Sequence, residues 1–165
     1  MSKSRVLIVD DEADIRELLS MTLQRMGLET DCAASEFEAV QLLQRCSYDL
    51  CLTNMRLPDG DGLKLLEHVT AEYGSTPVAV ITAHGSTENA VAALKAGAFD
   101  FVSKPVELPR LRELVRNALL LARPAGSGRL RVYRRRIGLS SPRSGGPHVH
   151  RVRRIQDYRH RPARC

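Results

Sequence analysis

The sequence contains no tryptophan, and its four cysteines lie far apart without a single CxxC pair. This spacing argues against a zinc site or a dithiol redox motif. No apolar run approaches the roughly 18 residues of a membrane helix, and the first residues lack the pattern of a secretion signal. We therefore expect a cytoplasmic protein that does not associate with a membrane.

Acidic residues are almost absent from the last quarter of the chain. Residues 124–165 contain 12 arginines, no lysine and one acid, whereas residues 1–123 contain 13 lysines and arginines against 18 acids. The formal net charge of +6 is an average over these two unlike segments. The sequence predicts a folded domain over residues 1–122 and an arginine-rich tail over residues 123–165, where low hydrophobicity and high charge favour disorder.

Five short apolar runs, rich in β-branched residues, predict five strands in the first 122 residues. Each run is followed by a segment with helical spacing, which predicts five helices. Because strands and helices alternate and the first and third strands are apolar almost throughout, the pattern indicates an α/β protein with a parallel sheet covered by helices on both faces. The expected strands are residues 5–9, 28–33, 49–53, 78–82 and 99–103.

The helical segments carry recognisable ends and apolar stripes. Gly27 follows the first stripe at a position that ends helices, and Ser35 with Glu38 forms a capping box at the start of the second. Pro109 lies in the first turn of the last helix, where its missing N–H is harmless. The side chains expected to be buried are Ile15, Leu18, Leu19, Thr22 and Met26 in the first helix, Ala90, Val91 and Leu94 in the fourth, and Leu111, Leu114, Val115 and Ala118 in the fifth.

Polar residues follow the carboxyl ends of four predicted strands, where the functional crevice of an open α/β sheet lies. Two adjacent carboxylates beside a third oxygen ligand suit Mg²⁺, and a lysine and a hydroxyl opposite them could hold two oxygens of a phosphoryl group. Alone, the two carboxylates could instead cap the first helix. The residues are Asp10 and Asp11 after the first strand, Asn54 after the third, Thr82 after the fourth and Lys104 after the fifth.

Five motifs occur in order along residues 4 to about 121. They are Val9-Asp10-Asp11-Glu12, the loop from Met55 to Gly62, Ile81-Thr82-Ala83, the segment from Ala96 to Phe101, and Lys104-Pro105. This set resembles the receiver domain of bacterial two-component response regulators, and especially that of NtrC-type regulators of sigma-54 promoters. The resemblance implies a CheY-like (flavodoxin-like), doubly wound five-stranded parallel sheet of order 2-1-3-4-5 with five helices. It also implies a signalling module of a phosphorelay rather than an enzyme.

The resemblance places Asn54 at the phosphoacceptor position, where the family has an aspartate. It implies that Asp11 would bind Mg²⁺ directly, Asp10 through water, and Arg56 through its backbone carbonyl. An amide oxygen is a far poorer nucleophile than a carboxylate and gives no stable acyl phosphate. We therefore expect a chain that cannot be phosphorylated and binds Mg²⁺ weakly. Because every partner residue is intact, we favour an introduced or recent Asp-to-Asn change over a naturally degenerate receiver.

Two further groups of residues take their expected roles from the same resemblance. Thr82 and Lys104 would contact the phosphoryl oxygens, Thr82 and Phe101 would change position on activation, and Lys104-Pro105 would be a cis peptide. The expected partners are a cognate sensor histidine kinase and a second copy of the chain. The face expected for dimerisation is formed by the fourth helix, the fifth strand and the fifth helix, with Asn89, Lys95, Arg110, Arg112 and Glu113.

The resemblance stops near Arg123. An NtrC-type protein would continue into an ATPase domain and a helix-turn-helix, but no GxxxxGK[ST] motif occurs, so we expect a receiver without its output domains. Twelve arginines without a lysine suit a frame-shifted reading of a GC-rich gene; the alternative is a basic arm that binds DNA non-specifically, which would make a degenerate receiver a phosphorylation-independent regulator.

Two enzyme-like or ligand-binding alternatives are weaker. A Mg²⁺-dependent phosphotransferase of the haloacid-dehalogenase kind would need a DxD motif, but Asp10 is followed by Asp11 and Glu12. A flavin- or nucleotide-binding protein would need phosphate-cradling amides in the first βα loop, which offers acids instead. The receiver interpretation therefore leads.

Overall fold

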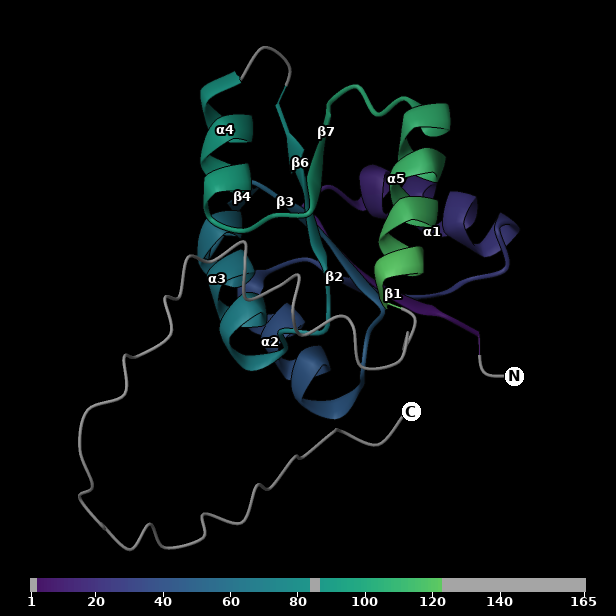
Figure 1. Ribbon diagram of the computed structural model, residues 1–165, viewed down its shortest axis with the longest axis horizontal. Helices are drawn as coiled ribbons and strands as arrows, with labels where there is room; N and C mark the ends of the chain where they lie inside the picture. The colour runs from purple at the N-terminus through teal and green to yellow at the C-terminus, as the bar shows by residue number, and fades with distance from the viewer. Residues whose placement is uncertain (1–2, 84–86, 123–165) are drawn as a thin grey trace, which may run out of the picture. The chain divides into compact units, whose positions relative to one another are not determined.

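The computed structural model describes residues 3–83 and 87–122, in which strands and helices alternate (Figure 1). None of the helices in these two stretches has the length and apolar character of a bilayer-spanning segment. The predicted arginine-rich tail, residues 123–165, lies outside the described residues. The strands are β1 (Arg5–Val9), β2 (Glu29–Ala33), β3 (Leu50–Asn54), β4 (Arg56–Leu57), β5 (Gly60–Asp61), β6 (Val78–Thr82) and β7 (Asp100–Ser103), and the helices are α1 (Ala13–Arg25), α2 (Glu36–Arg45), α3 (Gly62–Glu72), α4 (Thr87–Lys95) and α5 (Leu108–Ala122).

Five parallel strands form the main sheet in the order β2-β1-β3-β6-β7. Counted without the short strands β4 and β5, this is the predicted order 2-1-3-4-5, so the CheY-like topology is confirmed. The central strands β3 and β6 are buried at every residue, as expected for parallel strands covered on both faces. The short antiparallel hairpin of β4 and β5, which pairs Arg56 with Asp61, is not among the predicted strands.

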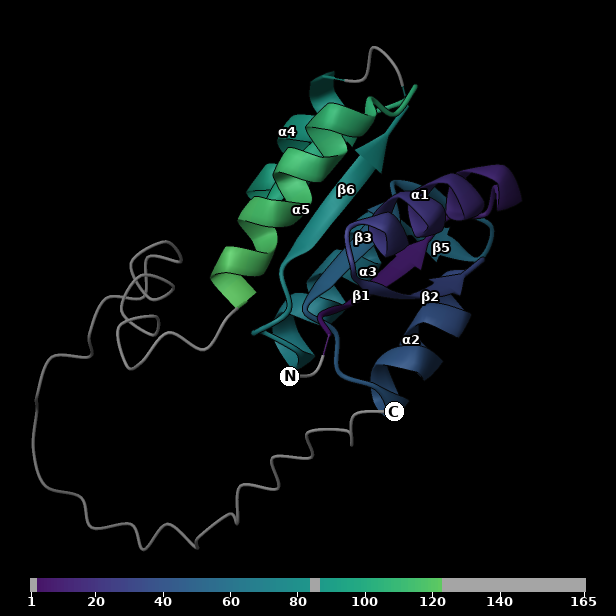
Figure 2. The ribbon, with the colours of Figure 1, turned by 90° about the vertical axis from the view of Figure 1, so that its right-hand side faces the viewer.

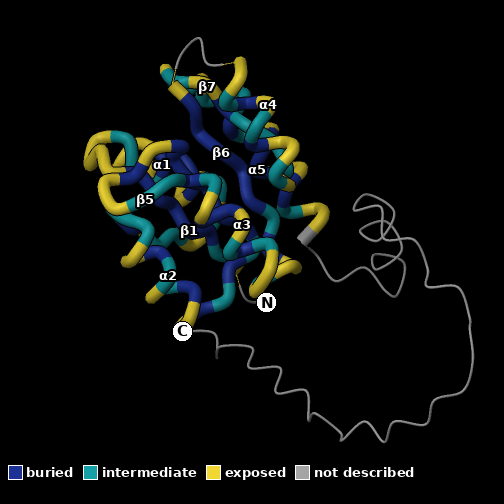
Figure 3. The backbone as a smooth tube through the Cα atoms, turned by 90° about the vertical axis from the view of Figure 1, so that its left-hand side faces the viewer, coloured by how far each residue is buried: buried dark blue, intermediate teal, exposed yellow. Residues whose placement is uncertain are grey.

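Helices cover the sheet on both faces. Helices α1 and α5 pack on one face around Leu19, Leu23, Leu111 and Leu114, and α2, α3 and α4 pack on the other. Figures 1 and 2 show α1 and α5 together on one side of the sheet, and Figure 3 shows the strands as buried backbone between partly exposed helices. The four residues predicted to form the buried stripe of α5 are all inaccessible to solvent, as expected.

Three of the predicted core residues are exposed instead. Leu18 in α1 is 39% exposed, and Val91 and Leu94 in α4 are each 44% exposed. The buried stripe of α4 is formed by Ala90 and Ala93, whose small side chains face the core while the larger ones point outward. Apolar spacing alone did not distinguish these two faces of the helix.

The predicted capping box of α2 forms, with one difference. Ser35 Oγ accepts a hydrogen bond from Glu38 N at 3.2 Å, as expected. The Glu38 carboxylate, however, accepts from Ala34 N at 2.8 Å rather than from the N–H of Ser35. The start of α2 is therefore stabilised by reciprocal side-chain contacts that extend one residue further back than in the standard motif.

A second cap on α2 comes from the hairpin of β4 and β5. The two carboxylate oxygens of Asp59 accept hydrogen bonds from Glu36 N at 2.8 Å and from Phe37 N at 2.9 Å. These bonds hold the pKa of Asp59 below its ordinary value. Asp59 thus satisfies two amides that would otherwise lack partners at the helix start.

Removal of this cap should lower the stability of the fold in a pH-dependent way. We expect Asp59→Ala to melt below the parent at pH 7, whereas Glu67→Ala, which removes an exposed carboxylate of α3, should not. Because the folded pKa of Asp59 is depressed, its contribution is complete above the unfolded pKa of about 4 and is lost as the pH falls through the folded pKa. Thermal melts at pH 7 and pH 2.5 check this. If the melting temperatures of Asp59→Ala and the parent differed by the same amount at both pH values, the prediction would be contradicted.

Candidate functional site

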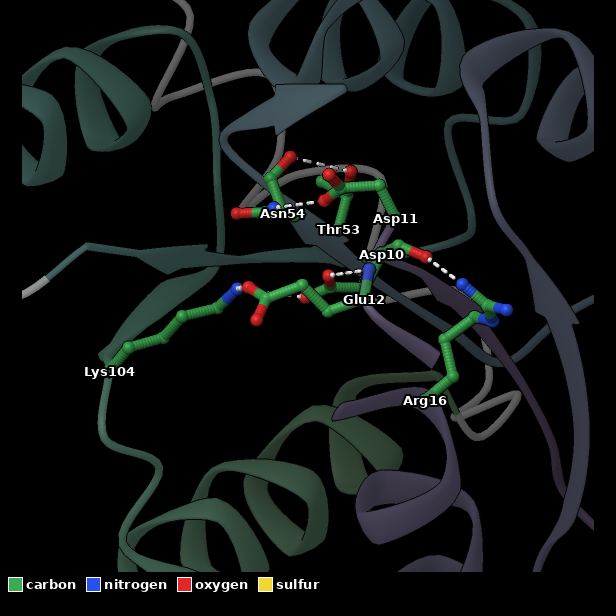
Figure 4. Close-up of polar contacts among 7 residues, drawn as sticks. All are labelled: Asp10, Asp11, Glu12, Arg16, Thr53, Asn54 and Lys104. Atoms are coloured by element: carbon green, nitrogen blue, oxygen red, sulfur yellow. Dashed lines mark hydrogen bonds and ion pairs between the residues drawn. The ribbon is translucent and has the colours of Figure 1, made fainter. Parts of the chain in front are cut away.

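The carboxyl ends of four strands meet at one edge of the sheet. The strand register pairs Val9 with Thr53 and Asn54 with Ile81. Thr82 in turn pairs with Ser103. The polar residues predicted for the site lie at or just after these positions, so the parallel sheet brings them together, and Figure 4 shows several of them directed toward one another.

Lys104 contacts two acids that follow β1. Its Nζ lies 2.7 Å from Glu12 Oε1 and 3.2 Å from Asp10 Oδ2 (Figure 4). The sequence predicted Asp10 for this site but not Glu12, although Glu12 directly continues the acidic run of Asp10 and Asp11. Within the described residues, no hydrogen bond or ion pair joins Lys104 to Asn54. The Lys104 ammonium is neutralised by Asp10 and Glu12, the acids that follow β1.

Asn54 contacts the other member of the acidic run. Its Nδ2 donates a hydrogen bond to Asp11 Oδ1 at 3.1 Å (Figure 4), and the residue is only 9% exposed. An aspartate at this position would have no hydrogen to donate and would bring a second carboxylate toward Asp11. The amide therefore converts what would be a repulsive contact into an attractive one.

Asp10 is fully buried and bonded through both its backbone and its side chain. Its carbonyl accepts from Arg16 Nη1 at 2.7 Å, and its Oδ1 accepts from Glu12 N at 2.9 Å. Glu12 is the N-cap of α1 and makes no side-chain cap bond, so the acid that contacts the start of this helix is Asp10, through the N–H of Glu12. The remaining oxygen, Asp10 Oδ2, is paired with the Lys104 ammonium at 3.2 Å and has no other polar partner within the described residues.

Burial and charge act in opposite directions on the two central groups. Burial raises the pKa of Asp10 above its ordinary value, although the Glu12 N–H and Lys104 both act to lower it. Burial lowers the pKa of Lys104, but its contacts with Glu12 and Asp10 outweigh this and raise the pKa. Lys104 therefore remains a cation across the physiological pH range.

The acidic run has the donors of a divalent-cation site. One carboxylate oxygen from each of Asp10, Asp11 and Glu12 lies within 4.8 Å of the others. These are the hard oxygen ligands that Mg²⁺ prefers, and at Asp10 Oδ2 the cation or its water would take the place of the Lys104 ammonium. The residues present therefore fit Mg²⁺, with Lys104 as a competing cation.

The other predicted site residues lie around this cluster. Thr82 is 1% exposed, and its Oγ1 has no hydrogen-bond partner within residues 3–83 and 87–122. The Lys104–Pro105 peptide is cis, as expected. Arg56 has an exposed side chain in β4, and Phe101 is half-buried in β7, so neither side chain belongs to the acidic cluster.

Gly62 holds the start of α3 against the end of β3. A Cβ at this position would collide with the carbonyl oxygen of Asn54 and lie 3.0 Å from Met55 Cα. The Gly62 N–H donates to Met55 O at 2.8 Å across the same contact. The position of Asn54 thus depends on a residue without a side chain eight positions later in the sequence.

Two arginines predicted for the dimerisation face lie on different flanks of α5. Arg110 of α5 contacts Asp100 of β7 at 2.7 Å and Glu113 at 3.7 Å, which is consistent with the expected face. Arg112 instead lines a depression beside the end of α1, because it lies on the opposite flank of α5. The dimerisation face, with Arg110 and Arg112, stays a prediction.

Comparisons with known proteins agree with this geometry. The PilR response regulator protein of Pseudomonas aeruginosa is 59% identical over 124 residues, which cover 75% of this chain and 28% of that protein. The regulatory protein AtoC of Escherichia coli is 41% identical over 118 residues, which cover 72% of this chain and 26% of that protein. The chain thus spans little more than a quarter of the length of these relatives.

Solved structures and a family model show the same relationship. A CheY-like receiver domain protein from Methanospirillum hungatei superposes with a TM-score of 0.71 at 31% identity, covering 76% of this chain and all of that one. NtrX from Brucella abortus gives a TM-score of 0.70 at 33% identity, covering 73% of this chain and 28% of that one. The model of the response regulator receiver domain matches residues 6–116. The chain therefore belongs to the family of response regulator receiver domains.

Proposed function

We propose that residues 1–122 form the receiver of a two-component phosphorelay that controls transcription at sigma-54 promoters, and that Asn54 prevents this chain from accepting a phosphoryl group. The observation that carries the proposal is the position of Asn54, at the end of β3 and hydrogen-bonded to Asp11 at 3.1 Å. Family membership and the similarity to PilR and AtoC support the regulatory setting. The expected partner is a cognate sensor histidine kinase, in the cytoplasm.

The chemistry of phosphoryl acceptance requires a carboxylate at position 54. A carboxylate oxygen attacks the phosphorus of the donor and forms an acyl phosphate, while the donor's bond to phosphorus breaks and its histidine, or acetate in the case of acetyl phosphate, leaves. An amide oxygen is too weak a nucleophile for this step. Lys104 and Thr82 would hold phosphoryl oxygens. This role is supported by the Lys104 cation just after β7 and by the buried Thr82 hydroxyl, which has no partner among the described residues. When bound by the acids after β1, Mg²⁺ would neutralise charge on the phosphoryl group.

The direct test is incubation with acetyl phosphate and Mg²⁺, followed by intact-mass measurement. We expect no phosphoryl group on the parent chain and one on an Asn54→Asp variant. Asn89→Asp is a matched control, because it makes the same amide-to-carboxylate change on α4, outside the acidic cluster. The control should stay unlabelled.

Each outcome of this test has a separate meaning. Equal labelling of the parent and the Asn54→Asp variant would refute the block at Asn54. An Asn54→Asp variant that remains folded but unlabelled would refute the receiver function itself. For the tail, residues 123–165, we propose at most a non-specific electrostatic contribution to DNA binding, which should disappear on truncation and at high salt.

A further inference from the structure

Helix α1 exposes two large apolar side chains in the middle of its outward face. Leu18 is 39% exposed and Met21 is 47% exposed. An exposed acid, Asp14, precedes them and an exposed base, Arg25, follows. Because these positions are spaced i, i+4, i+7 and i+11, they form a single stripe along the helix, which we call the α1 stripe.

The charged ends of the α1 stripe are not neutralised by neighbours. In the part of the chain that the structure describes, neither Asp14 nor Arg25 makes an ion pair or a side-chain hydrogen bond. Arg25 shares a depression of about 670 Å³ with Arg112 and Arg116 of α5, which are also without acidic partners in this part. The basic end is therefore a cluster of three arginines beside an acid-apolar-apolar-base pattern.

The α1 stripe is complementary to a second α1 stripe that runs in the opposite direction. A two-fold axis passing between positions 18 and 21 of two antiparallel helices would set Leu18 against the partner's Met21. The same axis would set Asp14 against the partner's Arg25, and because the symmetry repeats the contact, each dimer would contain two such ion pairs. An interface of this kind is isologous, so it closes at two copies and cannot grow into a filament.

We propose that the α1 stripe is a self-association surface whose occupant is the α1 stripe of a second copy of this chain. Charge complementarity selects this occupant, because the stripe supplies both an acid and a base at the required separation. The tail cannot take its place, since residues 124–165 carry 12 arginines and one acid and would repel the arginine cluster. This surface is separate from the face of α4, β7 and α5 expected from the sequence.

The dimer should be weak and sensitive to salt. One pair of helices of this length buries less than the roughly 1,200 Å² of a standard interface, and exposed ion pairs contribute little each. We expect a dissociation constant on the order of 100 µM at low ionic strength. Raising the salt concentration should weaken it, because the end pairs are open to solvent.

Reciprocal charge exchange in the full chain tests the proposal by sedimentation equilibrium. Asp14→Arg and Arg25→Glu should each weaken self-association by roughly tenfold or more, because like charges then meet at both ends of the interface. An equimolar mixture of the two variants should recover association, since each supplies the charge that the other lacks. The recovery also shows that both variants are folded, and circular dichroism provides an independent check.

Leu94→Glu is the matched control, because it replaces another exposed apolar residue on α4. It should leave the dimer unchanged. The proposal is overturned if only Leu94→Glu dissociates the dimer, or if the mixture of the two charge variants stays monomeric. A parent chain that is monomeric up to millimolar concentration would also overturn it, leaving the α1 stripe to a different protein.

Discussion

A Gly62→Ala variant is expected to lose about 3 kcal/mol of folding free energy and to melt roughly 10 °C below the parent. The added Cβ would collide with the carbonyl oxygen of Asn54 and crowd Met55 Cα, and both are backbone atoms. A backbone carbonyl at the end of a central strand cannot rotate away as a flexible side chain can. The strand end or the first turn of α3 must therefore shift.

Thermal denaturation followed by circular dichroism measures this loss. Gly74→Ala is the matched control, because its nearest neighbour would be Thr70 O at 3.4 Å and its φ is not positive. This control should melt within a few degrees of the parent. Equal melting temperatures for Gly62→Ala and the parent would show that the contact between α3 and β3 is looser than the structure indicates.

An Asn54→Asp variant is expected to be less stable than the parent in Mg²⁺-free buffer. The change removes the hydrogen bond to Asp11 and adds a charge about 3 to 4 Å from that carboxylate. A pair of unit charges at this distance repels by between roughly 1 kcal/mol, at the dielectric constant of water, and 4 kcal/mol, at an effective value near 20. Lys104 offsets part of this repulsion, so the net loss should fall in the lower half of that range.

Millimolar Mg²⁺ should reverse the difference in stability between the Asn54→Asp variant and the parent. The variant presents one more carboxylate to the cation than the parent, so its melting temperature should rise more on addition of Mg²⁺. Asn89→Asp, with its new carboxylate on α4, should not show this extra rise. A variant that is at least as stable as the parent without Mg²⁺ would contradict the electrostatic argument.

Much of the fold and of the site could be predicted because each rests on local pattern and simple topology. The alternation of apolar runs and helical stripes predicted the five long strands, and parallel strands necessarily bring Asp10, Asn54, Thr82 and Lys104 to one edge. Both the sheet order and the interpretation as a signalling module rather than an enzyme are confirmed.

The remaining features depend on contacts between segments that are distant in the sequence. The ion pair of Lys104 with Glu12 joins residues 92 positions apart, and the acidic run after β1 does not itself show which of its acids the lysine meets. The exposure of Val91 and Leu94 depends on how closely α4 approaches the sheet. That approach is determined by tertiary packing around Ala93 rather than by the spacing of apolar residues.

The cap that Asp59 provides also has a dynamic consequence. Since its carboxylate holds the amides of Glu36 and Phe37, 23 and 22 residues away, the β4–β5 hairpin and the first turn of α2 should open together rather than independently. Hydrogen exchange at those two amides would then report motion of the segment that follows Asn54. The exchange rates of these two amides therefore report any rearrangement of the loop between Asn54 and Gly62.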